Sequence, residues 1–87
     1  MVSKKVLVKG HNGLHIKPAG ALSQIALGFQ SAAYLKVRNY NVNAKSVLGI
    51  LSAQVRQNEE IELVCSGDDE QECLDSMIAC IEKYNVI

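Results

Sequence analysis

The sequence predicts an α+β fold, in which a four-stranded antiparallel sheet carries three helices on one face. Two observations predict it. Four segments place apolar side chains at every second position, as strands with one buried face do, and three segments place them at helical spacing. These segments follow one another in the order βαββαβα. Because a chain of 87 residues can bury only one small core, we expect a single domain over residues 1–87.

The first part of the chain is predicted to form a strand, a turn and a helix. Residues 2–9 are typical of a strand, because Val6 and Val8 share one face and lysines flank the apolar centre. The sequence His-Asn-Gly at residues 11–13 indicates a turn. Pro18 then suits the first turn of a helix, where proline is tolerated. That helix is expected to bury one apolar stripe, made of Ala19, Leu22, Ile25, Ala26 and Phe29.

The middle of the chain predicts a hairpin and a short helix. Residues 33–38 alternate apolar and polar side chains, as a half-buried strand should. Asn39 and Asn41 suit a tight turn, after which residues 40–44 return as a short strand. Ser46 is a favourable N-cap for the short apolar helix that follows it.

The end of the chain predicts one more strand and a closing helix. In residues 60–66, one face holds Ile61, Leu63 and Cys65, and the other holds Glu60 and Glu62. Asp69, with Glu72 three residues later, resembles a capping box at the start of the last helix. The apolar face of this helix is predicted to consist of Leu74, Met77, Ile78 and Ile81.

Composition narrows the class of protein. No apolar run has the ~20 residues that a membrane span needs, and the first residues lack an apolar signal sequence, so we expect a cytoplasmic protein without membrane insertion. Cys65, Cys73 and Cys80 lack zinc-site spacing and are expected to be core residues in a reducing compartment, with no metal bound.

Charge is unevenly distributed along the chain. Residues 1–58 hold eight basic and no acidic residues, whereas residues 59–87 hold nine acidic residues and one lysine. Two interpretations follow. The halves could form separate surfaces, of which the basic one would attract an acidic partner, a phosphate or nucleic acid, or the charges could interleave when the chain folds.

His15 is the residue with the clearest chemical potential. It follows the predicted turn and precedes the predicted helix, so its ring is expected at a helix N-terminus, where unpaired backbone N–H groups favour anions. A neutral imidazole nitrogen there can attack phosphorus, and Lys17 would supply a mobile positive charge. The ordinary alternative is a solvated surface histidine. His11 has no helix behind it and is expected to be inert.

Two segments carry a resemblance to a known family. Residues 13–19 (Gly-Leu-His-Ile-Lys-Pro-Ala) closely resemble the active-site segment of the HPr proteins, the histidine phosphocarriers of the bacterial phosphoenolpyruvate-dependent sugar phosphotransferase system. Residues 43–49 (Asn-Ala-Lys-Ser-Val-Leu-Gly) resemble the regulatory-serine segment of that family, and residues 66–70 are similar too. The resemblance implies an HPr-like open-faced β-sandwich. It also implies that His15 accepts a phosphoryl group from enzyme I and passes it to enzyme IIA domains in sugar uptake, without a cofactor.

The resemblance also implies regulatory and docking roles. In many members from low-GC Gram-positive bacteria, HPr kinase/phosphorylase modifies the serine that matches Ser46, and this form binds a catabolite-control transcription factor. Leu48 is expected to be exposed docking surface and Leu51 core. The family usually has arginine at the position of Lys17, and arginine and lysine are not equivalent beside a phosphate. It usually has a small or hydroxyl residue where this chain has Ile16. The expected docking residues are Asn12, Ile16, Gly20, Lys45, Val47, Leu48 and Leu51.

Two alternatives to a general phosphocarrier remain. The first is a paralogue kept for regulation through Ser46 or for a nitrogen-related relay, although the regulatory-only type lacks the histidine that this chain retains. The second is a small anion- or RNA-binding module, but Phe29 is the one phenylalanine and tryptophan is absent, so few side chains could stack on bases and we expect no nucleic-acid partner. An enzyme is not expected, because the sequence has no Gly-rich phosphate loop and no carboxylate pair.

Overall fold

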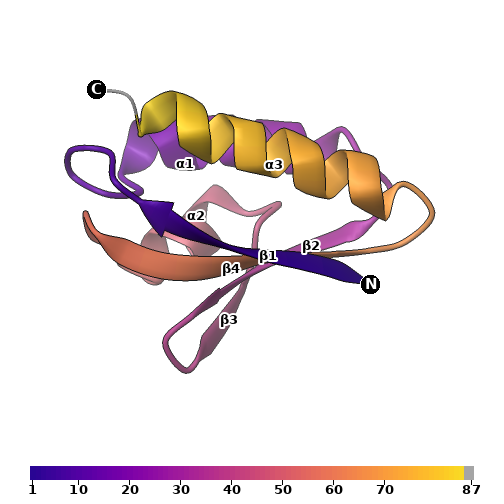
Figure 1. The fold of residues 1–87 in the computed structure, drawn as a ribbon, viewed down its shortest axis with the longest axis horizontal. Helices are drawn as coiled ribbons and strands as arrows, with labels where there is room; N and C mark the ends of the chain where they lie inside the picture. The colour runs from indigo at the N-terminus through magenta and orange to yellow at the C-terminus, as the bar shows by residue number, and fades with distance from the viewer. Residues whose placement is uncertain (86–87) are drawn as a thin grey trace.

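The computed structural model describes residues 1–85 and contains four strands and three helices in the predicted order (Figure 1). The strands form one sheet of order β1-β4-β2-β3, in which every neighbouring pair is antiparallel. The predicted α+β fold is therefore confirmed. The elements are β1 (Val2–Val8), α1 (Ile16–Leu27), β2 (Ala32–Val37), β3 (Tyr40–Asn43), α2 (Val47–Ser52), β4 (Glu59–Ser66) and α3 (Glu70–Tyr84).

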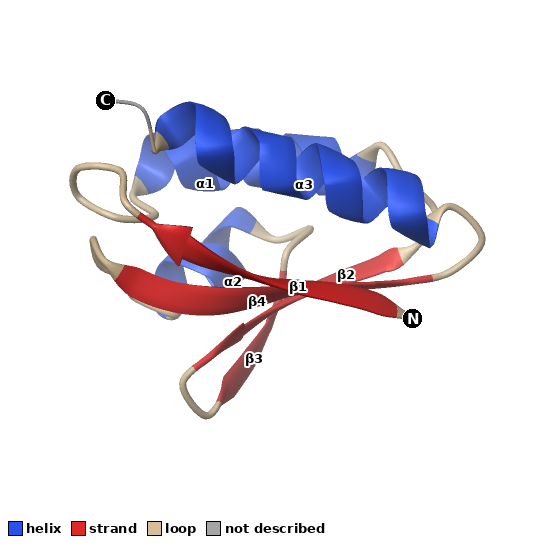
Figure 2. Cartoon of the chain, in the orientation of Figure 1, coloured by secondary structure: helices blue, strands red, loops and turns tan. Residues whose placement is uncertain are grey.

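The helices cover one face of the sheet and leave the other open. Helices α1 and α3 lie side by side above the strands, and the short helix α2 packs against α1 and β3 (Figure 2). The alternation predicted for β2 is confirmed, because Ala33, Leu35 and Val37 are buried beneath the helices. Burial of these apolar side chains between the sheet and the helices stabilises the two layers.

The hairpin between β2 and β3 is tighter than the prediction. Its turn consists of Arg38 and Asn39, and Asn41 lies inside β3 opposite Lys36, so the prediction that Asn41 belongs to the turn is wrong. Arg38 takes a φ of 54°. A two-residue hairpin needs positive φ in its turn to match the twist of its strands, and here an arginine supplies it.

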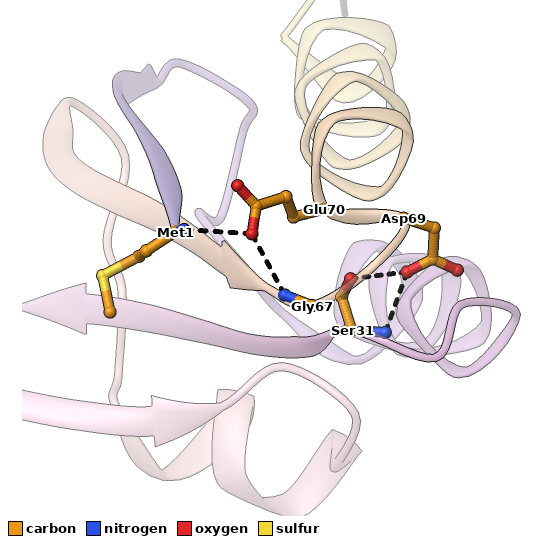
Figure 3. A network of polar contacts seen from close by, with 5 residues as sticks. All are labelled: Met1, Ser31, Gly67, Asp69 and Glu70. Atoms are coloured by element: carbon orange, nitrogen blue, oxygen red, sulfur yellow. Dashed lines mark hydrogen bonds and ion pairs between the residues drawn. The ribbon is translucent and has the colours of Figure 1, made fainter.

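The predicted capping box at the start of α3 is wrong. Asp69 occupies the N-cap position, but its carboxylate accepts hydrogen bonds from the backbone N–H of Ser31 at 2.9 Å and from the Ser31 hydroxyl (Figure 3). Glu70 completes the network: it accepts a bond from Gly67 N–H at 3.1 Å and pairs with the N-terminal ammonium of Met1 at 3.0 Å. The carboxylate of Asp69 thus joins α3 to the segment between α1 and β2, where backbone N–H groups would otherwise lack a partner.

The cysteines and the charges are placed as packing requires. All three cysteines are free and buried, as predicted, and burial raises the pKa of the Cys65 thiol to about 12.

In the sheet, Glu62 of the acidic half lies between Lys5 and Lys36 of the basic half, so there the charges interleave. No helix within residues 1–85 is long and apolar enough to cross a membrane. The same residues contain no group of three His, Cys, Asp or Glu side chains that could hold a metal ion.

Candidate functional site

His15 occupies the N-cap of α1, where the sequence predicted it. Its carbonyl oxygen accepts the first helical hydrogen bond from Ala19 N–H at 3.0 Å. The side chain makes no capping bond and is exposed, so the ring is open to solvent and to a partner. Pro18 lies in the first turn, where its missing N–H costs nothing. The exposed imidazole therefore lies beside backbone N–H groups that favour an anion.

The turn before His15 is held in place by a distant segment of the chain. Asn12 and Gly13 both have positive φ, 71° and 62°, and Gly13 N–H donates to the carbonyl of Gly10 at 3.0 Å. Leu14 N–H then donates to the carbonyl of Val55 at 3.1 Å. Leu14 is buried, which anchors the turn from below. The backbone just before His15 is consequently fixed by the hydrogen bond and by the core packing of Leu14.

A shallow depression of about 530 Å³ lies beside the exposed ring. Two segments line it: the turn, through His11, Asn12 and His15, and the stretch that follows α2, through Leu51 and Arg56. None of the residues that line it carries a carboxylate. The depression is therefore suited to receive a negatively charged group.

The lining of this depression includes one histidine expected to be inert and leaves out the lysine expected beside the phosphate, and neither placement tests the role expected of the residue. His11, which was expected to be inert, lies at the same depression as His15, whereas Lys17 is exposed on α1 and is not part of its lining. Arg56 is part of the lining, and sequence reasoning missed it. No local pattern marks Arg56, because its position depends on the long-range contact between residues 14 and 55.

Ser46 has the capping role that the sequence predicted. Its Oγ accepts a hydrogen bond from Gly49 N–H at 3.0 Å, and its carbonyl accepts one from Ile50 N–H, also at 3.0 Å. Both bonds satisfy N–H groups in the first turn of α2. The side chain is half-buried, so part of it remains exposed to solvent.

The expected docking residues differ in exposure. Leu48 is 79% exposed and Ile16 is 66% exposed, which is high for large apolar side chains. The expected exposure of Leu48 is confirmed, and its docking role stays a prediction. Leu51 was expected to be a core residue and was also included among the docking residues. It packs against the core and borders the depression beside His15. Val47 is half-buried against the same core.

Lys45 and Gly20 also belong to the expected docking residues. The ammonium of Lys45 donates to the carbonyl of Phe29 at 2.9 Å, and its own carbonyl accepts from the Ser23 hydroxyl at 3.0 Å. Lys45 therefore ties the segment before α2 to α1, in addition to any part in docking. Gly20 faces open space, and a Cβ at this position would meet no atom within 4 Å.

Comparison with known proteins agrees with this arrangement. Residues 2–83 match the family described as the PTS HPr component phosphorylation site. The HPr-like protein Crh of Halalkalibacterium halodurans is 40% identical over 83 residues, which are 95% of this chain and 99% of that protein. Phosphocarrier protein HPr of Mycoplasma genitalium is 33% identical over 84 residues, 95% of this chain and 96% of that one. The crystal structure of HPr-C-His from Thermoanaerobacter tengcongensis has a TM-score of 0.93 at 35% identity, covering 98% of this chain and 96% of its own. This chain therefore belongs to the HPr family of phosphocarrier proteins of the phosphotransferase system.

Proposed function

We propose that this protein carries a phosphoryl group on His15, which it accepts from enzyme I and passes to enzyme IIA domains in sugar uptake. The observation that carries the proposal is the exposed, uncapped imidazole of His15 at the N-terminus of α1, beside a depression without carboxylates. A nucleophile that must meet two partners in turn has to be accessible to both. The membership of the chain in a family of phosphocarriers supports the same role.

The chemistry requires little of the protein beyond positioning. A ring nitrogen of His15 attacks the phosphorus, a nitrogen–phosphorus bond forms, and the bond to the donor breaks with its electron pair left on the donor. The N–H groups of the first turn of α1 and the ammonium of Lys17 stabilise the charge on the phosphoryl oxygens. Reversal of the same step delivers the group to the acceptor.

Partner proteins dock on the apolar surface beside the ring. Ile16 of α1 and Leu48 of the adjoining helix α2 are exposed although both are large and apolar, and such side chains are favoured at protein interfaces. Asn12, in the turn before His15, and Leu51, near the end of α2, both line the depression beside the ring. Gly20, Lys45 and Val47 extend the docking surface along α1 and the start of α2.

A second candidate is regulation through Ser46. The chain is 40% identical to an HPr-like protein Crh, and Crh of Bacillus subtilis is described as a catabolite repression HPr. In this role HPr kinase/phosphorylase modifies Ser46, and the modified protein binds a catabolite-control transcription factor. The N-cap position is compatible with a phosphate, because the N–H groups that bond the hydroxyl also favour an anion. A nitrogen-related relay would use His15 with different partners.

Incubation with enzyme I and phosphoenolpyruvate, followed by intact mass measurement and acid treatment, tests the proposal. We expect one acid-labile phosphate in the parent protein and none in His15→Ala, while His11→Ala, the matched control from the same depression, remains labelled. Because the ring of His15 is exposed and uncapped, its removal should change the free energy of unfolding by no more than about 0.5 kcal/mol. Undiminished labelling of His15→Ala would refute the carrier role of this residue. Acid-stable phosphate after incubation with the kinase would indicate Ser46.

A further inference from the structure

Arg56 is held against the turn that carries His15. Gly13, two residues before His15, packs so closely on the segment after α2 that a Cβ on Gly13 would lie 2.8 Å from Arg56 Cα and would overlap the Val55 carbonyl. The hydrogen bond from Leu14 N–H to that carbonyl, at 3.1 Å, fixes the same contact. The stem of the Arg56 side chain therefore starts a few ångströms from the backbone that presents the ring.

The backbone of Arg56 is fixed on its other side by Glu59. Arg56 N–H donates to a Glu59 carboxylate oxygen at 2.7 Å, and Glu59 N–H donates to the carbonyl of Arg56 at 3.2 Å. These two bonds close a tight turn. Arg56 is thus anchored through its main chain, and its exposed side chain remains available.

The carboxylate on that turn forms its ion pair with Arg38, and the Arg56 guanidinium acts on it only as a nearby positive charge. The second oxygen of Glu59 accepts from the Arg38 guanidinium, and this bond is the main reason that the pKa of Glu59 lies below its usual value. Arg38 also donates to the carbonyl of Ala53, so its guanidinium is occupied by contacts within the fold. Within residues 1–85, both ion pairs exclude Arg56.

Arg56 is the permanent cation among the residues that line the depression beside His15. His11 and His15 also line it, no carboxylate does, and Lys17 is not part of it. A guanidinium presents paired N–H donors that match two oxygens of a phosphoryl group, which an ammonium cannot do. The charge of the lining and the paired donors of a guanidinium thus both favour an anion with several oxygens.

We propose that Arg56 is a phosphate-binding residue of this site, and that its guanidinium bonds two oxygens of the phosphoryl group that His15 accepts. This inference rests on the proposed function. As the bond between His15 and phosphorus forms and the bond to the donor breaks, the three non-bridging oxygens keep their negative charge, and Arg56 stays protonated and bonds to them throughout. The phosphorylated partner must accordingly approach over the depression between the His15 turn and Arg56.

Titration with inorganic phosphate, followed by the NMR chemical shifts of the His15 ring, tests the binding role without any partner protein. We expect Arg56→Gln to weaken phosphate binding about three- to tenfold, because a bidentate guanidinium contact is strong but this one is exposed to solvent. Arg56→Lys should lie between Arg56→Gln and the parent protein. The matched control is Lys36→Gln, which removes one exposed positive charge from β2 and should leave the affinity unchanged.

The rate of phosphoryl transfer from enzyme I provides the second measurement. We expect Arg56→Gln to slow labelling of His15 by a similar factor, and Lys36→Gln to leave it unaltered. Equal phosphate affinities for Arg56→Gln and Lys36→Gln would overturn the inference, and labelling of the parent by enzyme I would then leave the proposed function standing. Absence of labelling in the parent would instead overturn the proposed function, while the titration would still decide whether Arg56 binds phosphate.

Discussion

Replacement of Gly13 by alanine should damage both the stability of the fold and the geometry of the site. Gly13 has a φ of 62°, a left-handed conformation in which a side chain is strained. Its missing Cβ also leaves the room that the Val55 carbonyl and Arg56 Cα occupy. An added methyl group therefore forces the turn away from this segment and weakens the bond from Leu14 N–H to Val55, which is 3.1 Å long.

The size of the effect follows from these two causes. The left-handed backbone costs a residue with a side chain about 1–2 kcal/mol, and forcing an extra carbon into a packed contact costs about 1–3 kcal/mol. Gly13→Ala should therefore lower the free energy of unfolding by about 2–5 kcal/mol. Gly20→Ala is the matched control. It adds the same methyl group inside α1, where nothing lies within 4 Å, and should raise stability by about 0.5–1 kcal/mol.

Urea denaturation of the three proteins, followed by circular dichroism, measures both changes. We also expect slower phosphorylation by enzyme I for Gly13→Ala under conditions in which the variant is folded, because its turn no longer presents His15 against Arg56. A Gly13→Ala protein as stable as the parent would refute the argument from close approach. A destabilised variant with an unchanged phosphorylation rate would show that the turn can shift without consequence for the ring.

Substitutions at three further positions test other parts of the structure. Ser46→Ala removes an N-cap bond and should cost about 1 kcal/mol in thermal or urea denaturation without slowing acceptance of phosphate. Ser46→Asp should be at least as stable as the parent but accept phosphate more slowly from enzyme I, with a deficit that shrinks between low and high salt; equal rates would leave Ser46 as a cap alone. Lys17→Glu should slow transfer in stopped-flow experiments by about one to two decades, and Lys17→Arg should preserve or raise the rate. The Ser31 hydroxyl and the Gln30 N–H hold the pKa of Asp69 below its usual value, so this carboxylate stabilises the fold above its unfolded-state pKa and the contribution is lost as pH falls through the folded-state pKa. Asp69→Asn should accordingly be less stable than the parent at neutral pH and approach it in acid, as urea midpoints across this range will show.

Local patterns account for the part of the fold that was predictable. In strand β2 every second side chain is buried, and helix α1 has one apolar stripe. Each element can therefore be predicted from its own residues without reference to the rest of the chain. The role of Asp69 could not be predicted from neighbouring residues. Its partners Gln30 and Ser31 lie 39 and 38 residues earlier, and nothing near Asp69 in the sequence indicates that its carboxylate faces them and not its own helix.

The same distinction separates His15 from Arg56. A turn, a proline and an apolar stripe surround His15 within a few positions, so its place at a helix N-terminus could be predicted. Arg56 reaches the site only because Gly13 admits the backbone of a segment more than forty positions later. A cation placed by tertiary contact leaves no periodic signal, and its residue type alone does not distinguish it from the other basic residues of residues 1–58.

The construction of the site explains how a carrier can be both well positioned and accessible. The contacts that place His15 are made by its main chain and by its neighbour Leu14: the His15 carbonyl bonds Ala19 N–H, and Leu14 bonds Val55 through its N–H and packs its side chain in the core. The ring itself makes no capping bond. Substitution of the ring should therefore abolish transfer and spare stability, whereas substitution of Gly13 should affect both. An exposed side chain that makes no capping bond can exchange one partner for another without rearrangement of the core, which is the property that a phosphoryl relay requires.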